Sequence, residues 1–135
     1  MKSWKELDVW NKAHGLVLEI YKLTATFPSD ERFRLTDQLC RAASSIPANI
    51  VEGQARQTTK EYIHFLYTAR GSLEETRYHL LLARDLELLD SDTYATLETD
   101  YETVSKMLNG LIHSLRRKEI EGSGHKDAGA NGPNP

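Results

Sequence analysis

The chain has little of what disulfide-stapled, secreted and membrane-spanning proteins need. Cys40 is the only cysteine among 135 residues, which excludes an intrachain disulfide and favours a reducing compartment. The longest dense apolar run, Leu80 to Ala83, is too short to cross a bilayer, and the first residues lack an apolar signal core. We therefore expect a cytoplasmic protein with no membrane partner.

An excess of basic charge is also missing. The net charge is −3 and the pI is about 5.9, so the whole-chain basic signature of many nucleic-acid-binding proteins is absent. Any contact with nucleic acid would have to come from a local patch. A hydrophobic fraction of 39% and a charged fraction of 27% are typical of one charge-rich helical domain.

What the sequence does contain is helical periodicity. Apolar residues recur at helical spacing over about residues 7–26, 32–54, 58–88 and 93–118, with no strand-like alternation between them. The connections are short, so we predict an all-α, antiparallel up-and-down four-helix bundle over residues 1–120. Residues 121–135 are rich in Gly, Asn and Pro and are predicted to form a disordered C-terminal tail.

Local signals predict where the segments begin, bend and end. Ser29 or Asp30 is a candidate N-cap for the second segment, and Thr58 begins the third with Glu61 at capping-box spacing. Pro47 lies inside the second segment and predicts a kink there, because proline removes a backbone hydrogen bond. Gly53 predicts the end of that helix.

The second segment carries a polar stripe beside its apolar one. The stripe consists of Arg41, Ser45, Asn49, Glu52 and Arg56, at steps of four, four, three and four residues. Such a stripe at the edge of a core indicates either a structural polar network or a ligand surface. The structural alternative pairs Arg41 and Glu52 with partners on the third segment, such as Ser72 or Glu75, because buried polar groups need partners.

Motifs for catalysis or metal binding are scarce. Glu61-x-x-His64 is half of a di-iron bundle motif, but the sequence has no second copy. Cys40 has no histidine at a fixed spacing, and no nucleophile elbow or phosphate loop occurs. We therefore predict no enzyme, no catalytic residues, no metal site and no cofactor.

The third segment offers a basic face and surplus apolar surface. Arg70, Arg77 and Arg84 are seven residues apart and share one side, although Glu74 at ion-pair spacing also suits an ordinary solvated face. Apolar residues flank the main stripe of this helix on more than one side, which predicts burial by a second subunit.

Three stretches together resemble the 23S rRNA intervening-sequence protein family, also called four-helix bundle proteins. They are Trp10-Asn-Lys-Ala13 with Ile20-Tyr21-Lys-Leu-Thr24 and Phe27-Pro28, then the central run from Gln38 to Arg56, and Ala69-Arg70-Gly71-Ser72-Leu73-Glu74-Glu75. The resemblance covers roughly residues 4–117 and implies a four-helix bundle that assembles as a homopentameric ring. A related branch, the accessory variability proteins of diversity-generating retroelements, implies binding to nucleic acid; those relatives are markedly basic, unlike this chain.

These observations predict a non-enzymatic, oligomeric interaction protein that binds RNA or a ribonucleoprotein through arginines displayed on a ring. The predicted contact residues are Arg41, Arg56, Arg70 and Arg77. The predicted polar network that orients them consists of Ser45, Asn49, Glu52, Ser72 and Glu75. The alternative is a protein–protein scaffold whose polar stripe serves the subunit interface, with no binding of nucleic acid.

Overall fold

The computed structural model describes the backbone of residues 3–130 and the side chains of residues 3–122. All regular elements in that part of the chain are helical, as predicted. The four main helices are α1 (Asp8–Thr24), α2 (Asp37–Gln54), α3 (Thr59–Asp85) and α4 (Ser91–Ala130). Shorter turns precede them: the 3₁₀ turns η1 (Trp4–Glu6) and η2 (Ser29–Glu31), and the π-helical turn η3 (Arg32–Thr36).

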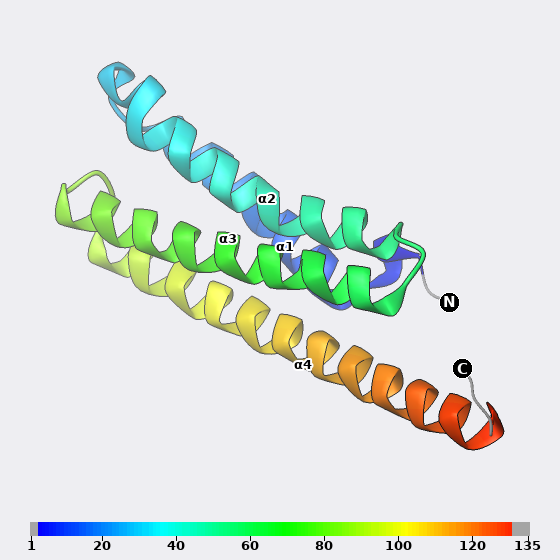
Figure 1. Ribbon diagram of the computed structural model, residues 1–135. Helices are drawn as coiled ribbons and strands as arrows, with labels where there is room; N and C mark the ends of the chain where they lie inside the picture. The colour runs from blue at the N-terminus through cyan, green and yellow to red at the C-terminus, as the bar shows by residue number, and fades with distance from the viewer. Residues whose placement is uncertain (1–2, 131–135) are drawn as a thin grey trace.

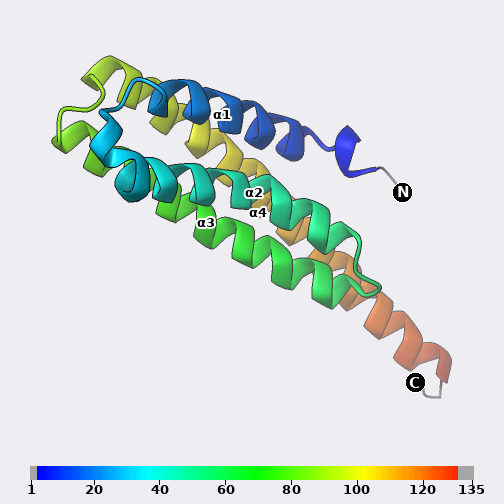
Figure 2. The same cartoon turned by 90° about the horizontal axis from the view of Figure 1, so that it is seen from above.

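The helices form a four-helix bundle in which successive helices alternate in direction (Figures 1 and 2). Each helix contacts its neighbours in the sequence, and α1 also contacts α4, which closes the bundle. The C-terminal part of α4 extends beyond the other helices, at the end of the bundle where α2 connects to α3. None of the helices in the described part of the chain is long and apolar enough to cross a membrane.

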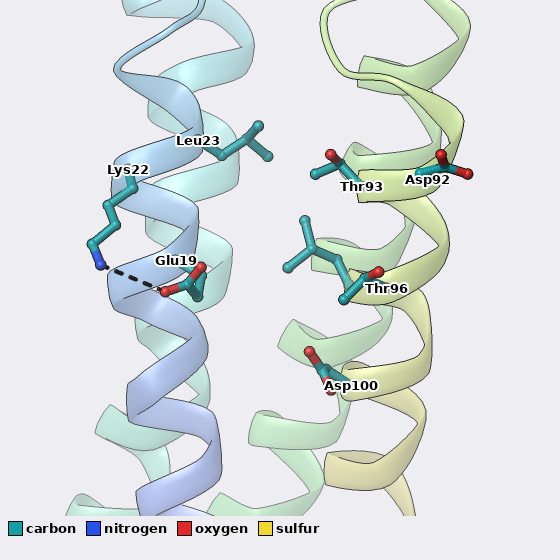
Figure 3. A pocket seen from close by; sticks show the side chains of 8 residues that line it. Glu19, Lys22, Leu23, Asp92, Thr93, Thr96 and Asp100 are labelled. Atoms are coloured by element: carbon teal, nitrogen blue, oxygen red, sulfur yellow. Dashed lines mark ion pairs between the residues drawn. The ribbon is translucent and has the colours of Figure 1, made fainter.

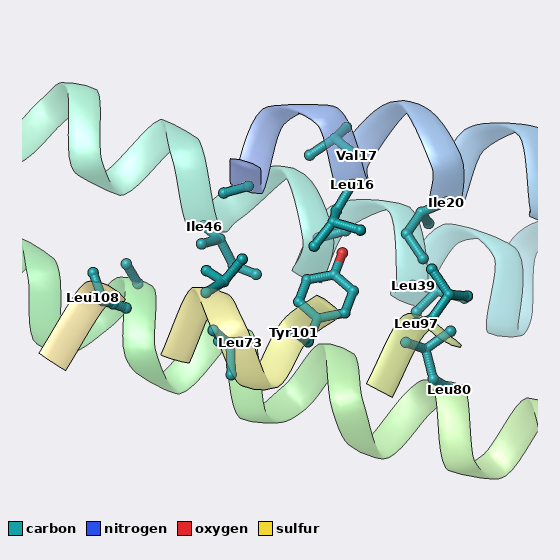
Figure 4. Packing of buried hydrophobic residues seen from close by; sticks show 14 of the residues in the cluster. Leu16, Val17, Ile20, Leu39, Ile46, Leu73, Leu80, Leu97, Tyr101 and Leu108 are labelled. Carbon is teal, nitrogen blue, oxygen red and sulfur yellow. The ribbon is translucent and has the colours of Figure 1, made fainter. Parts of the chain in front are cut away.

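The core is a continuous apolar cluster supplied by all four helices (Figure 4). Its fully buried members include Ile20, Leu39, Ile46, Leu73 and Leu108. Burial at this scale is the main favourable term in folding. The helical periodicity of the sequence therefore identified the faces that meet in the core.

Tyr101 is the largest fully buried side chain in this core. Its hydroxyl points toward α1 and has no hydrogen-bond partner among the described residues (Figure 4). Burial, and secondarily the charge of Asp100, raises the pKa of Tyr101 far above its ordinary value, so the phenol stays neutral.

A side chain caps the start of two of the four main helices, α3 and α4. The Thr58 hydroxyl accepts a hydrogen bond from the Glu61 amide at 3.1 Å, which confirms the predicted start of α3. Asp90 does the same for α4 by accepting from the Thr93 amide at 2.7 Å, and this bond lowers the pKa of Asp90. The predicted start of the second segment at Arg32 was wrong.

Helix α2 begins at Asp37 because the preceding chain forms irregular turns. Neither Ser29 nor Asp30 caps a helix through its side chain. Arg34 has φ −113° and ψ −107°, outside the helical region, so a regular helix cannot extend back through it. This backbone geometry has no signature in the apolar periodicity on which the prediction depended.

Pro47 lies inside α2, which is assigned as one α-helix from Asp37 to Gln54. The bend predicted at Pro47 stays a prediction. Gly53 is not the end of the helix but its penultimate residue, and it sits where α2 approaches α3. The disordered tail predicted from residue 121 also stays a prediction: α4 extends to Ala130, and residues 131–135 lie outside the described part.

Candidate functional site

The centre of the predicted polar stripe forms a hydrogen-bonded seam between α2 and α3. Ser72 donates its hydroxyl to the Ser45 hydroxyl at 2.9 Å. The Asn49 amide donates to the Ser45 hydroxyl at 2.9 Å and to the Ser45 carbonyl at 2.8 Å. All three residues are half-buried. We call Ser45, Asn49 and Ser72 the polar seam, and its bonds satisfy groups that the helix contact partly removes from water.

The charged ends of the stripe form ion pairs with residues four positions away and not with carboxylates of α3. Arg41 pairs with Asp37 at 3.6 Å along α2, and Arg56, just after α2, pairs with Glu52 at 2.9 Å. The guanidinium of Arg56 also lies 4.6 Å from the centre of the Phe65 ring. The expected pairing of Arg41 and Glu52 with α3 is therefore replaced by pairing four positions along the chain, because residues four apart on one helix are already neighbours.

Glu75, the other predicted network residue, faces His79 on its own helix at 3.5 Å. A surface groove of about 370 Å³ runs over this region, and its rim includes Arg41, Ser72 and Glu75. Arg41 and Glu75 carry opposite charges, so the groove has no net affinity for an anion. It fits the structural interpretation of the stripe better than a ligand surface.

Arg77 is the most strongly paired arginine of the predicted contact set. Its guanidinium contacts Glu98 at 2.6 Å, Glu74 at 3.2 Å and Glu102 at 3.3 Å. Burial alone would lower the pKa of Arg77, but the hydrogen bond and charge of Glu98 and the charges of the other two carboxylates raise it. Arg77 therefore tethers α3 to α4, and its positive charge is already neutralised.

Arg70 lies in a different setting, beside a basic hollow between α3 and the end of α4. The hollow has a volume of about 390 Å³. Its polar lining consists of Tyr67, Arg70, Asn109, His113, Arg116 and Arg117. Ile112 and Ile120 complete it. We call it the arginine hollow.

Tyr67 organises two of the guanidiniums in this hollow. The Arg70 guanidinium lies 4.7 Å from the centre of the Tyr67 ring, and the Arg116 guanidinium donates to the Tyr67 hydroxyl at 2.8 Å. Arg70 also donates to the Asn109 amide oxygen at 3.1 Å. All of these partners are neutral, so they orient the guanidiniums without cancelling their charge.

No carboxylate pairs with Arg70, Arg116 or Arg117 within residues 3–122. The other predicted contact arginines, Arg41, Arg56 and Arg77, each have at least one. The arginine hollow is thus a local concentration of uncompensated positive charge on a chain of net charge −3. Such a concentration attracts anions even when the whole chain is acidic.

Charge is segregated along the bundle. The arginine hollow lies toward the end of the bundle where α2 connects to α3. The two helices that form it also carry Lys60, on α3, and Lys118, on α4. Most acidic residues lie toward the other end. Those on α3, α4 and their connection are Glu74, Glu75, Asp85, Glu87, Asp90, Asp92, Glu98, Asp100 and Glu102. The net acidity of the chain therefore belongs mainly to one end of the molecule.

A second hollow lies at the acidic end, between α1 and α4 (Figure 3). It has a volume of about 480 Å³. Glu19 pairs with Lys22 at 3.7 Å on its rim, and Asp100 pairs with Lys12 at 3.3 Å. Its lining contains neither histidine nor cysteine. Among the described residues, no cluster of three potential metal ligands occurs.

Sequence reasoning missed Arg116 and Arg117. The sequence predicted a helix that ends near residue 118, where bases interact favourably with the helix dipole and require no ligand. Helix α4 instead continues to Ala130, so the dipole does not account for these arginines. Arg70 and Tyr67 are three residues apart on α3, and they meet Asn109 and Arg116 on α4 only because the two helices pack antiparallel in one register. That register is a property of the tertiary structure. The spacing of Tyr67 and Arg70, three residues apart, was the one part of the hollow that the sequence indicated.

The fold and the site together define an antiparallel four-helix bundle with a polar seam inside and a basic hollow outside. The chain belongs to the 23S rRNA-intervening sequence protein family, whose model matches residues 5–110. This confirms the resemblance found in the sequence.

A solved structure of the same kind comes from Bacteroides thetaiotaomicron, a protein with unknown function from the S23 ribosomal protein family. It is 27% identical to this chain, with a TM-score of 0.69, over 77% of this chain and 97% of that chain. No curated protein matches the chain. The family match identifies the fold and the family. Neither the description of the family nor that of the solved structure names an enzymatic activity.

Proposed function

We propose that this protein is a non-enzymatic, oligomeric interaction protein that binds RNA, or an RNA-containing complex, through the arginine hollow. The observation that carries the proposal is the set of guanidiniums of Arg70, Arg116 and Arg117, which have no carboxylate partner within residues 3–122. The guanidinium group of arginine binds phosphate through paired hydrogen bonds, and phosphate is the anionic group of nucleic acids.

The structure changes which arginines carry the proposal. Arg70 remains from the predicted set and is joined by Arg116 and Arg117. Arg41 and Arg56 are exposed and singly paired, so they stay predicted secondary contacts. Arg77 is removed from the proposal because three carboxylates surround it.

Self-association is the second part of the proposal, and its surface differs from the one predicted. On α3, Ile63 is buried and Tyr67, Leu81 and Leu82 are half-buried within the single subunit. Exposed apolar residues occur on α1, where Leu18 is 51% and Tyr21 is 55% exposed, and also at Tyr78 and Leu86 toward the end of α3.

Leu18 and Tyr21 continue a stripe that begins at Trp10 and His14, at steps of four, four and three residues. The stripe carries no acidic or basic residue other than His14, which suits an interface between copies. We therefore place the subunit contact on this face of α1. The predicted pentamer would display five arginine hollows and multiply the local field.

The binding proposal is tested by fluorescence anisotropy with a labelled structured RNA and a duplex DNA, each titrated with protein at rising salt. Replacing both Arg116→Gln and Arg117→Gln should weaken RNA binding by at least about tenfold at low salt. It should also flatten the salt dependence by about one unit of logarithmic slope for each phosphate that the variant no longer neutralises.

The matched control replaces Arg32→Gln and Arg34→Gln, two exposed arginines near the start of α2. It removes the same charge at the other end of the bundle and should leave affinity nearly unchanged. Equal losses in both double variants would show that net charge alone matters. Absence of binding at low salt would contradict the proposal and leave the alternative, a protein–protein scaffold whose polar stripe serves the subunit interface.

A further inference from the structure

Two guanidiniums of the arginine hollow share one tyrosine, and a third arginine lines the same hollow. Arg70 and Arg116 are both held by the same tyrosine, one on its ring face at 4.7 Å and one on its hydroxyl at 2.8 Å. Arg117 lines the same hollow of about 390 Å³. A single anionic group in this space would meet all three side chains at once.

Acidic residues limit how far the positive surface extends along α4. Glu119 and Glu121 follow Arg116 and Arg117 in the next turn. A duplex is contacted through successive phosphates along its backbone, so a binding surface for it needs cations spread along a path. The basic run Arg116-Arg117-Lys118 is followed by Glu119 and Glu121, so the described side chains of α4 do not continue such a path.

The remaining wall of the hollow is suited to a base. Ile112 is buried, whereas Ile120 is 70% exposed and offers an apolar surface beside the guanidiniums. Asn109 adds an amide beside them. An apolar side chain and a guanidinium plane can contact the face of a base only when that base is not stacked in a helix.

On the basis of the proposed function, we infer that the arginine hollow accepts one unpaired nucleotide of RNA, with its phosphate among Arg70, Arg116 and Arg117 and its base against Ile120. Each subunit then engages a single-stranded segment or loop and not the side of a duplex. The preference for unpaired RNA comes from the apolar wall, while the arginines supply affinity for any phosphate.

The test uses one 20-nucleotide RNA as a labelled single strand and as a blunt duplex with its complement, measured by anisotropy at one low salt concentration. The single strand should bind about tenfold more tightly, the size expected for one stacked base. Ile120→Ser should remove most of this preference by weakening single-strand binding alone. Leu86→Ser, at an exposed leucine at the far end of α3, is the matched control and should change neither affinity.

A competition experiment separates the base from the phosphate. A nucleoside monophosphate should displace the single strand at a concentration about tenfold lower than ribose 5-phosphate does. Equal competition, equal binding of duplex and single strand, or an unchanged preference in Ile120→Ser would each overturn the inference. If duplex and single strand bind equally, but the double variant Arg116→Gln with Arg117→Gln weakens binding of both RNA forms, the proposed function survives and the inference of an unpaired nucleotide fails. If no RNA binds, both fail.

Discussion

Glu87 is a single residue whose backbone explains how the third helix ends. Within the described residues, it is the one non-glycine with positive φ, at 62°. Its amide donates to the Arg84 carbonyl, and the Leu88 amide donates to the Ala83 carbonyl, both at 2.9 Å. This is the pair of bonds that closes a helix around a left-handed residue, a position that glycine usually occupies.

Replacing Glu87→Gly should therefore stabilise the protein by about 0.5–1 kcal/mol, because glycine adopts this conformation without the clash of a Cβ atom. Urea denaturation followed by circular dichroism measures the change. Glu87→Ala is the matched control, since alanine keeps the Cβ and should stay within a few tenths of a kcal/mol of the parent. A gain with alanine equal to the gain with glycine would show that the glutamate charge, not φ, was unfavourable.

At the scale of elements, the contact between α2 and α3 depends on one glycine. A Cβ placed on Gly53 would lie 2.8 Å from Phe65 Cβ, 3.0 Å from Tyr62 Cδ1 and 3.2 Å from the Tyr62 carbonyl oxygen. Two of these atoms are fixed by the backbone of α3, so they can yield only if the helices separate. Glycine lowers the helix propensity at this position, but only a residue without a Cβ atom lets the two helices approach this closely.

Gly53→Ala should consequently destabilise the protein by about 1–3 kcal/mol, through overpacking that outweighs the gain in helix propensity. Gly71→Ala supplies the contrast, because a Cβ at that exposed position in α3 meets nothing within 4 Å. It should stabilise by about 0.5–1 kcal/mol. Chemical denaturation of both variants beside the parent checks the prediction, and a stabilising Gly53→Ala would contradict the close contact.

Sequence reasoning succeeded for elements whose determinants are local. The apolar periodicity identified all four helices, and the hydroxyl of Thr58 identified the start of α3. It failed at Arg34, which interrupts the predicted start of the second segment, and it did not reveal the close contact at Gly53. The turns before α2 and the close approach to α3 depend on residues distant in the sequence, and no local pattern encodes them.

At the scale of the whole molecule, separated charge and a stripe of exposed apolar residues suggest how copies would assemble. The basic hollow lies at one end, the acidic residues gather toward the other, and the apolar stripe of α1 lies on the side. Association through that side would leave every arginine hollow accessible. The two proposals are therefore compatible in geometry.

Multi-angle light scattering should give the parent protein a mass several times 15.4 kDa. Leu18→Glu with Tyr21→Glu should reduce it to a monomer, because an interface would bury the added charges without partners. The control is Tyr78→Glu with Leu86→Glu, at residues of α3 that are similarly exposed, and it should assemble like the parent. A monomeric parent would refute self-association, and dissociation of the control alone would move the interface to α3.

The sequence by itself determined the helices, the apolar faces that meet in the core, and the family, because each depends on periodicity or on residues close in the chain. Only the tertiary structure decided which charges remain unpaired. Arg70 and Arg77 look equivalent in the sequence, seven residues apart on one helix face. Packing against α4 places Arg77 among carboxylates and Arg70 beside Tyr67, Asn109 and Arg116. The physical reason is that an electrostatic site depends on distances across helices, and the register of one helix against another is set by the whole core.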